Sequence, residues 1–371
     1  MRHDAAPLAG GSRLSSIEVT PLSVPLPRPF HAAVRVIDRV DLILVTARDT
    51  DGIEGYGLSF AFGRDDARSI QTIAESLAPL VGSPPIDGIE SAWQVMRSAL
   101  EFAGCSGPAL AAVSAIDLAL WDCQYRRAQL PLWRALGGFR ASAPAYASAG
   151  SLALDPVALV GEVEALLESG HRAVKIKSRG DLAEDCARLS ALRGEFGPAL
   201  RIAVDANQSL TVKTAIRWAR AISAFDPWWI EEPVAADDLA GQAEVRHSLD
   251  CDLAAGESLF GVRSAAAAIE NRCVDILMPN LQRLGGLTPW RKVAAQAELA
   301  HVRMGAHVHP EYQTHLMCAF PGTVAVELWP GWPWIWQQSL ELHDGQVGAP
   351  KGPGLGLTPD PDRVAAWRAD Q

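Results

Sequence analysis

The sequence predicts an α/β protein in which a (β/α)-barrel of the TIM type follows an N-terminal α+β module. From Ala143 onward, short apolar runs alternate with longer amphipathic stretches in units of about 25–30 residues, which is typical of βαβ units and a parallel sheet. Asp205, Glu231 and Glu257 each close one of these apolar runs, and each lies 26 residues after the one before it. The first part of the chain instead has the strands and tight turns of an antiparallel sheet.

The α+β module is expected to span residues 1–140. Its strands are predicted to form an antiparallel meander at Ser16–Leu26, Val40–Arg48 and Glu54–Ser59. Helical periodicity follows, including a long segment over residues 107–128. The module therefore combines one small sheet with several helices.

The barrel is expected to span residues 141–340. Its strands are predicted near Tyr146, Val174, Ile202, Trp229, Leu253, Ile276, Met304 and Val326. Eight strands separated by helices favour a closed barrel over an open sheet. Residues 341–371 are rich in Gly and Pro and are expected to form an extension that runs back over the α+β module.

Composition excludes several classes of partner for this chain of 371 residues. The net charge is −10 and no basic run occurs, which argues against a nucleic-acid or membrane-surface partner. No apolar run reaches the ~20 residues of a membrane span, and no secretory signal is evident. The six cysteines are scattered without a metal-binding spacing, so we expect reduced thiols and a cytoplasmic location.

The three evenly spaced acids predict a metal site. In a parallel barrel the strand ends meet at one rim, so carboxylates at successive strand ends point to a common centre. Such carboxylates repel one another unless a cation lies between them, and a ligand set made only of oxygen favours magnesium. We therefore expect Asp205, Glu231 and Glu257 to hold Mg²⁺.

Two lysines and a histidine are the candidate acid–base residues. Strand alternation puts Lys175 and Lys177 on one face, and inside the barrel their mutual repulsion and burial would lower their pKa values, which suits a base. On an exposed strand the same pair would be an ordinary solvated face. His307, from the seventh strand, would flank the metal from the other side, although a single histidine is more often structural.

Together these motifs resemble the mandelate racemase subgroup of the enolase superfamily over nearly the whole chain. The matching segments are Lys175-Ile176-Lys177, Val204-Asp205-Ala206-Asn207, Trp229-Ile230-Glu231-Glu232-Pro233, Gly256-Glu257-Ser258, Met278-Pro279-Asn280, Leu284-Gly285-Gly286, His307 and, in the first module, the run from Ser114 to Asp122. Each segment alone is weak, whereas their order and spacing make the resemblance strong.

The resemblance implies a capping domain over a modified barrel and a role for each matching residue. Asp205, Glu231 and Glu257 match the Mg²⁺ ligands, Lys177 the base, and Lys175 the neighbour that keeps the pKa of that base low. Asn207 matches a polar residue near metal and substrate. Glu327 matches the residue that donates a hydrogen bond to the substrate carboxylate, which requires a protonated side chain.

One position departs from the subgroup pattern. The subgroup usually pairs its histidine with an aspartate at the end of strand six, and Asn280 stands there in this chain. Asparagine can orient the imidazole but cannot stabilise its cation by charge. The departure weakens His307 both as a base and as an acid, and it leaves Asn280 as a candidate substrate-binding residue.

In the family, loops of the capping domain recognise the substrate. Here these loops are residues 28–32 and 58–64. Arg28 and Arg64 are candidates to meet a distal hydroxyl or carboxylate, and His31 and Phe60 are further candidates to line the pocket. Ordinary surface packing is an equally good interpretation of each.

The resulting functional hypothesis is a Mg²⁺-dependent acid-sugar dehydratase. It would act on a small carboxylate substrate by abstracting the α-proton, forming an enediolate and eliminating the β-hydroxyl to give a 2-keto-3-deoxy acid. The first alternative is a racemase or epimerase of a 2-hydroxy acid, in which Lys177 and His307 exchange the proton across two faces. A non-catalytic metal-binding homologue is the second alternative. The resemblance also implies a homo-oligomer.

Overall fold

The N-terminal part of the chain is an antiparallel sheet covered by helices. The computed structural model describes residues 14–32, 35–82 and 88–369. The sheet has the order β1-β2-β3, from β1 (Leu14–His31), β2 (Val36–Asp49) and β3 (Glu54–Ala61). Helices α1 (Arg64–Gly82), α2 (Ile89–Ala99), α3 (Pro108–Arg127) and the short α4 (Leu132–Ala135) follow. The predicted meander and long helix are confirmed, with longer strands than expected.

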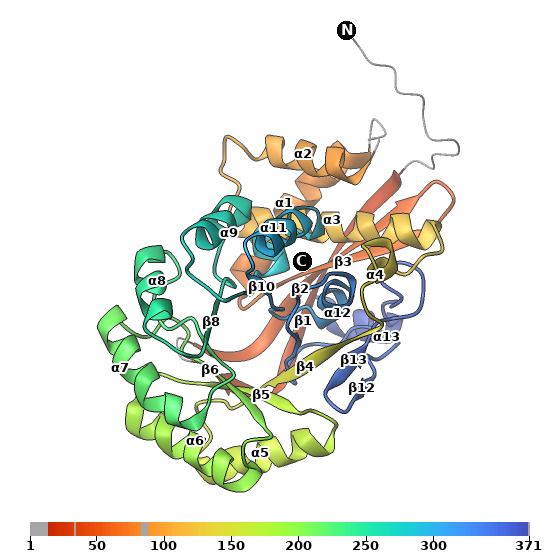
Figure 1. The fold of residues 1–371 in the computed structure, drawn as a ribbon. Helices are drawn as coiled ribbons and strands as arrows, with labels where there is room; N and C mark the ends of the chain where they lie inside the picture. The colour runs from red at the N-terminus through yellow and green to blue at the C-terminus, as the bar shows by residue number, and fades with distance from the viewer. Residues whose placement is uncertain (1–13, 33–34, 83–87, 370–371) are drawn as a thin grey trace.

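Helix α3 is buried along most of its length because it lies between the small sheet and the barrel (Figure 1). Its close approach to β3 depends on two glycines. A Cβ atom at Gly57 would lie 1.8 Å from the Ala115 carbonyl oxygen, and one at Gly55 would lie 2.2 Å from the Cys123 amide nitrogen. A side chain at either position would push the helix off the sheet.

The second part is a parallel barrel whose eight strands lie where the sequence predicts them. They are β4 (Ser142–Ser148), β5 (Ala173–Lys177), β6 (Arg201–Asp205), β7 (Trp229–Glu231), β8 (Asp252–Ala255), β9 (Ile276–Leu277), β10 (Arg303–Met304) and β11 (Val326–Leu328). Consecutive strands pair in parallel from β4 to β10, and β11 pairs with β4. A parallel bridge between Met304 and Thr323 joins β10 to the segment before β11 and completes the ring.

Helices connect these strands and form the outer layer of the barrel (Figure 1). They are α5 (Pro156–Glu168), α6 (Leu182–Phe196), α7 (Val212–Ile222), α8 (Leu239–His247), α9 (Gly261–Glu270), α10 (Leu281–Leu284), α11 (Leu287–Leu299) and α12 (Pro310–Ala319). Asp155, Asp181 and Asp238 begin three of them, and each side chain accepts at least one hydrogen bond from a backbone amide of the first turn. The predicted α/β class and barrel are confirmed.

Apolar side chains fill the barrel interior below the rim. Tyr146 and Trp229 contact each other with ring centroids 5.1 Å apart, in one cluster with Ala173 and Ala203. Because alternate residues of a strand face the same side, Lys175, Asp205 and Glu231 follow these apolar residues two positions along their strands. The polar layer is thereby placed at the carboxyl ends of the strands, above a packed core.

The C-terminal segment contacts both parts. A hairpin of β12 (Leu342–His343) and β13 (Gln346–Gly348) adds antiparallel pairing to β4. The Leu132 amide then donates to the Gly354 carbonyl at 2.7 Å, and the short helix α13 (Pro361–Trp367) lies against β1. The segment is therefore attached to the cap through backbone contacts.

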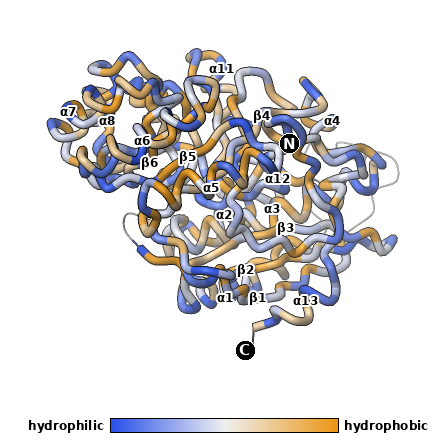
Figure 2. Tube along the Cα trace, turned by 90° about the horizontal axis from the view of Figure 1, so that it is seen from below, coloured by the Kyte–Doolittle hydropathy of each residue, from blue (hydrophilic) through white to orange (hydrophobic). Residues whose placement is uncertain are grey.

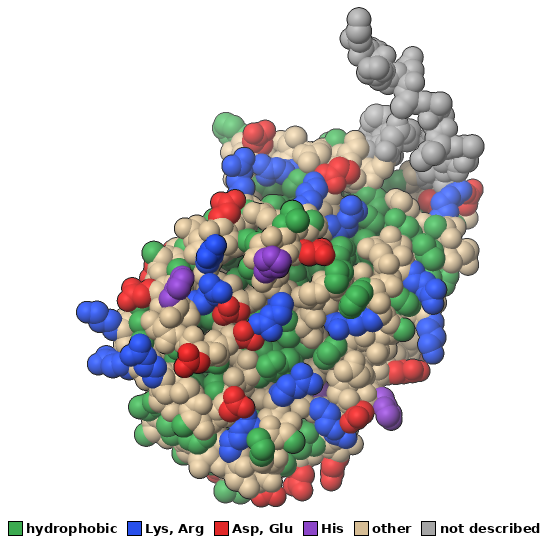
Figure 3. Space-filling model, in the orientation of Figure 1, with side chains coloured by type: hydrophobic (Ala, Val, Ile, Leu, Met, Phe, Trp, Pro, Cys, Tyr) green, Lys and Arg blue, Asp and Glu red, His purple; other side chains and the backbone are tan. Residues whose placement is uncertain are grey.

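Charged residues of both signs are interspersed on the surface shown in Figure 3. Hydrophilic residues fall largely on the outer turns of the tube in Figure 2, and apolar ones on the buried strands and inner helix faces. Of the helices that the structure describes, none is long and apolar enough to cross a membrane. All six cysteines are free thiols.

Candidate active site at the carboxyl ends of the strands

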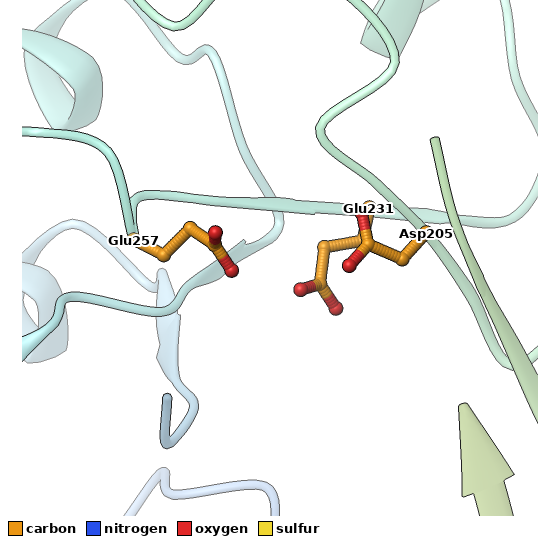
Figure 4. A group of neighbouring side chains, drawn as sticks. All are labelled: Asp205, Glu231 and Glu257. Carbon is orange, nitrogen blue, oxygen red and sulfur yellow. The ribbon is translucent and has the colours of Figure 1, made fainter. Parts of the chain in front are cut away.

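Asp205, Glu231 and Glu257 meet at the rim of the barrel. Asp205 ends β6, Glu231 ends β7 in register with it, and Glu257 follows β8 by two residues. One carboxylate oxygen from each lies within 4.8 Å of the other two. Figure 4 shows Glu257 extending toward the other two carboxylates from a separate part of the rim. Their equal spacing in sequence thus becomes a cluster in space.

Lys175 lies at the centre of this acidic cluster and is 1% exposed. Its Nζ donates to Glu231 Oε1 at 2.7 Å, lies 2.9 Å from Glu327 Oε1 and lies 3.7 Å from Asp205 Oδ2. The parallel pairing of β4 with both β5 and β11 brings the lysine and Glu327 together. One ammonium group therefore contacts carboxylates from three different strands.

Lys177 lies beside Lys175 on the same strand face. Its Nζ donates to Asp205 Oδ2 at 2.5 Å. The carbonyl of Lys177 accepts a hydrogen bond at 2.7 Å from the buried guanidinium of Arg188, on α6, which also donates to the Gly150 carbonyl. Arg188 was not singled out from the sequence, and it fixes the end of the strand that carries both lysines.

The expectation of lowered lysine pKa values is wrong for this arrangement. Burial acts to lower the pKa of Lys175, but Glu231 and Glu327 outweigh it and raise that pKa well above its usual range. The pKa of Lys177 is also raised, because Asp205 outweighs both burial and the charge of Lys175. Proximity to several carboxylates, which a strand pattern does not show, decides the direction.

Glu327 is held in its ionised form, whereas the resemblance implied a protonated one. Burial acts to raise its pKa, but Lys175, His307 and the Val308 amide lower the pKa to about 2. The Val308 N–H donates to Glu327 Oε2 at 2.6 Å. Val308 has a positive φ of 42°, which is unusual for a β-branched residue, and the next residue, His309, has a φ of 49°.

His307 lies at the side of the cluster away from the lysines. Its Nε2 is 2.9 Å from Glu257 Oε2, and its Nδ1 is 2.8 Å from Asn280 Nδ2. Asn280 also begins helix α10, where its Oδ1 accepts the amides of Gln282 and Arg283. The structure thus brings Lys177, His307 and the three carboxylates into one site.

Asn207 and Glu232 border the carboxylates, both with positive φ. The Asn207 amide nitrogens donate to Asp205 at 2.9 and 3.2 Å, while its Oδ1 is buried without a hydrogen-bond partner among the described residues. Burial raises the pKa of Glu232 well above its usual range, and the carboxylates of the cluster raise it further. Glu232 had been given no role from the sequence.

Trp229 and Arg283 contact two residues of the cluster, one at its carboxylate and one at its backbone. The Trp229 indole donates to Glu231 Oε2 at 2.9 Å, and Arg283 donates to the Glu257 carbonyl at 2.8 Å. The strand motif contained Trp229 as an apolar residue, and nothing in the sequence showed its N–H at a carboxylate.

The four cap residues that the sequence suggested for the pocket do not form one cluster. The guanidinium of Arg28 is 73% exposed and pairs with Glu162 at 2.6 Å, and Arg64 is exposed at the start of α1. The His31 backbone exchanges hydrogen bonds with Ser151 and Leu152 on the barrel loop after β4. Phe60 is buried between the rings of Phe62, His309 and Trp332. Of these four, His31 and Phe60 are joined to the barrel by hydrogen bonds of their backbones, Phe60 through Gln282.

The cluster has the properties of a site for a hard divalent cation. The converging donors are all carboxylate oxygens, and two neighbouring buried oxygens, Asn207 Oδ1 and Glu232 Oε1, have no hydrogen-bond partner in the described part of the chain. Buried carboxylates in this number need positive charge nearby. The residues present therefore fit a cation coordinated by oxygen, and Asp205, Glu231 and Glu257 could hold it.

Comparisons with known proteins agree with this architecture. Residues 16–137 match the mandelate racemase / muconate lactonizing enzyme N-terminal domain, and residues 158–363 match the enolase C-terminal domain-like family. The 3,6-anhydro-alpha-L-galactonate cycloisomerase of Streptomyces coelicolor is 34% identical over 93% of this chain and 95% of its own. The L-talarate/galactarate dehydratase of Salmonella typhimurium is 32% identical over 94% of this chain and 89% of its own.

A solved structure shows the same fold. L-Talarate dehydratase from Polaromonas sp. JS666, complexed with Mg and L-glucarate, has a TM-score of 0.90 and 31% identity, covering 97% of this chain and 98% of its own. The likeness extends over both domains, since it covers nearly the whole of both chains. The chain belongs to the mandelate racemase / muconate lactonizing enzyme family of the enolase superfamily.

Proposed function

We propose that the chain is a Mg²⁺-dependent lyase that abstracts the α-proton of a sugar acid and eliminates the β-oxygen, as a dehydratase of an aldonate or aldarate. The observation that carries this proposal is the placement of Lys177 at Asp205 and His307 at Glu257, on either side of the carboxylate cluster. The dehydratase relatives support it. Asp205, Glu231 and Glu257 are the proposed metal ligands.

In the proposed reaction Lys177 removes the α-proton and the C–H electron pair forms an enediolate. Bound Mg²⁺ would supply positive charge to the cluster and stabilise negative charge on the substrate carboxylate. With the charge of the carboxylates offset in this way, burial and the neighbouring charge of Lys175 would lower the pKa of Lys177, which favours a neutral amine as base. Collapse of the enediolate expels the β-oxygen, which takes the proton held by Lys177 and leaves as water, and the resulting enol tautomerises to the 2-keto-3-deoxy acid.

Incubation with Mg²⁺ and a panel of aldonic and aldaric acids in D₂O tests this function. A 2-keto-3-deoxy product is expected, and Lys177→Met should reduce its rate by roughly 10²–10⁴-fold because the general base is gone. Lys213→Met is the matched control, since Lys213 is exposed on the outer helix α7, and it should retain the rate of the unaltered chain. α-Deuterium with inversion would indicate the racemase alternative. No exchange and no product with any acid would contradict an enzymatic function.

A second candidate is opening of an anhydro-sugar acid by the same chemistry. The 34% identity to an anhydro-galactonate cycloisomerase favours it. Aromatic rings also pack where the cap meets β11: Trp329 lies 5.6 Å from Phe30 and 6.4 Å from Phe62 between centroids. Such faces suit the C–H surface of a ring. Mass spectrometry separates the two reactions, because dehydration removes one water from the substrate and isomerisation leaves its mass unchanged.

A further inference from the structure

The side-chain amide of Asn280 has its orientation fixed by the helix that it begins. Its Oδ1 accepts hydrogen bonds from the backbone amides of Gln282 at 3.0 Å and Arg283 at 3.3 Å. Backbone N–H groups at a helix start can only donate, so the end of the amide that faces them must be the oxygen. The other end, the NH₂ group, is therefore the one that faces His307.

This orientation decides which nitrogen of His307 carries the proton. Asn280 Nδ2 is a donor only, and it lies 2.8 Å from His307 Nδ1, which must then offer a lone pair. In a neutral imidazole the proton is then on Nε2, which lies 2.9 Å from an acceptor, Glu257 Oε2. One tautomer satisfies both contacts, and the other would place two donors face to face at Nδ1.

We propose that Asn280 is a positioning residue that holds His307 as the neutral Nε2–H tautomer, so that His307 donates a hydrogen bond to the substrate and accepts no proton from it. An aspartate at this position, as the subgroup usually has, would accept from Nδ1–H and leave a lone pair on Nε2. The single change from carboxylate to amide therefore reverses the polarity of the imidazole at the reacting edge.

The inference rests on the proposed function in one respect, the number of bases. With a proton on Nε2, His307 has no lone pair there for an α-proton, and Lys177 is the one base. The proton that Lys177 takes from the α-carbon is then the one available to the departing oxygen, so one base yields water and an enol, which becomes the keto acid when its hydroxyl proton moves to C3. A two-base racemisation has no second proton acceptor in this arrangement.

The tautomer can be measured without turnover. We would record long-range ¹H–¹⁵N spectra of the full chain labelled at histidine nitrogen, at neutral pH, with and without saturating Mg²⁺. Protonated and unprotonated imidazole nitrogens differ strongly in ¹⁵N shift, and comparison with His307→Gln assigns the His307 signals. A proton on Nε2 alone is expected in both conditions. A proton on Nδ1, alone or together with Nε2, would overturn the proposal.

The isosteric variant Asn280→Asp tests whether the contact of Asn280 with His307 Nδ1 sets the tautomer. Aspartate caps helices as well as asparagine, so the start of α10 should be kept, and Nδ1 of His307 should gain a proton. Asn271→Asp makes the same change on the exposed C-terminal end of α9 and should leave the His307 shifts unaltered. An unchanged tautomer in Asn280→Asp, or an equal change in Asn271→Asp, would show that Asn280 does not set it.

Turnover provides a second, separate readout. Glutamine can present an N–H where Nε2–H lies, so His307→Gln should keep more keto-acid formation than His307→Ala if donation is the role. Equal loss in both variants would contradict it. Because the spectra need no substrate, a chain that fails to act on any acid still yields the tautomer, and the two proposals can fail independently.

Discussion

At the scale of single residues, Lys175 has the largest share in balancing the buried charge. Its ammonium contacts Glu231, Glu327 and Asp205, all of which are almost fully buried. A buried carboxylate without a cationic partner lowers the free energy of unfolding, and such a group usually takes up a proton and becomes neutral. Burial raises the pKa of Glu231 to about 7, with Lys175 opposing the shift and the neighbouring carboxylates adding to it.

Replacing Lys175 with methionine should destabilise the metal-free protein strongly. Removing one partner of a buried ion pair costs about 3–5 kcal/mol, since the remaining charges stay buried. Urea unfolding in EDTA is the measurement, and added Mg²⁺ should narrow the deficit by binding the same carboxylates. Lys292→Met is the control, because Lys292 pairs with Glu90 at the surface and such pairs contribute about 0–1 kcal/mol. Equal losses in the two variants would contradict the central role of Lys175.

The sequence predicted the positions of the site residues better than it predicted their protonation. Strand periodicity placed Lys175, Lys177 and Asp205 on one face, and the equal spacing of the acids placed them at one rim. The direction of the lysine pKa shifts did not follow, because it depends on distances of a few ångströms between side chains from different strands. The Val308 amide at Glu327 was also unpredictable, since it arises from a strained turn.

At the scale of elements, the contact of β3 with α3 depends on a missing side chain. Gly57→Ala should lower the free energy of unfolding by about 1–3 kcal/mol or more, because the added methyl would overlap the backbone at Ala115. Gly161→Ala is the matched comparison in the exposed interior of α5, where nothing lies within 4 Å of the added atom. Alanine there should stabilise by about 0.5–1 kcal/mol. Equal effects of the two changes on the free energy of unfolding would show that position 57 has room for a side chain between β3 and α3.

The barrel elements were predictable because each is specified locally. All eight strands occur where short apolar runs predicted them, although β9 and β10 have two residues each. The pairing of β12 and β13 with β4 did not follow from the sequence, because a Gly- and Pro-rich segment gives no periodic signal and its partner lies about two hundred positions earlier. Local sequence patterns do not show which segments far apart in the chain pair as strands.

At the scale of the whole molecule, cap and barrel share buried polar contacts that join them. Gln282, on α10, accepts from the Phe60 amide at 2.8 Å and donates to the Phe60 carbonyl at 3.0 Å, as a neighbouring strand would. The Trp93 indole donates to the Gly285 carbonyl at 2.8 Å. Apolar residues of both parts also belong to one continuous core. The rim that carries the candidate site is therefore fixed relative to the cap.

The contact between Asp117 on α3 and Thr288 on α11 makes this attachment depend on pH. Asp117 is 0% exposed and accepts from the Thr288 hydroxyl at 2.6 Å and from its amide at 3.0 Å. Burial nevertheless raises the pKa of Asp117 from 3.8 to about 7. Because the folded state binds this proton more tightly than the unfolded state, the contribution is fully present below about pH 4 and is lost as the pH rises to about 7.

Comparison with Asp117→Asn isolates this effect, since both chains share every other titrating group. The unfolding free energy of the unaltered chain, minus that of the variant, should fall by up to about 4 kcal/mol between about pH 4 and pH 7 and stay level above, because each pKa unit corresponds to about 1.4 kcal/mol. Urea unfolding across this range measures it. The variant's amide also faces two donors, which lowers its stability at every pH and leaves the slope unaffected. A difference that is constant or rises with pH would mean that Asp117 is ionised in the folded protein, and that the joint between cap and barrel is a charged one.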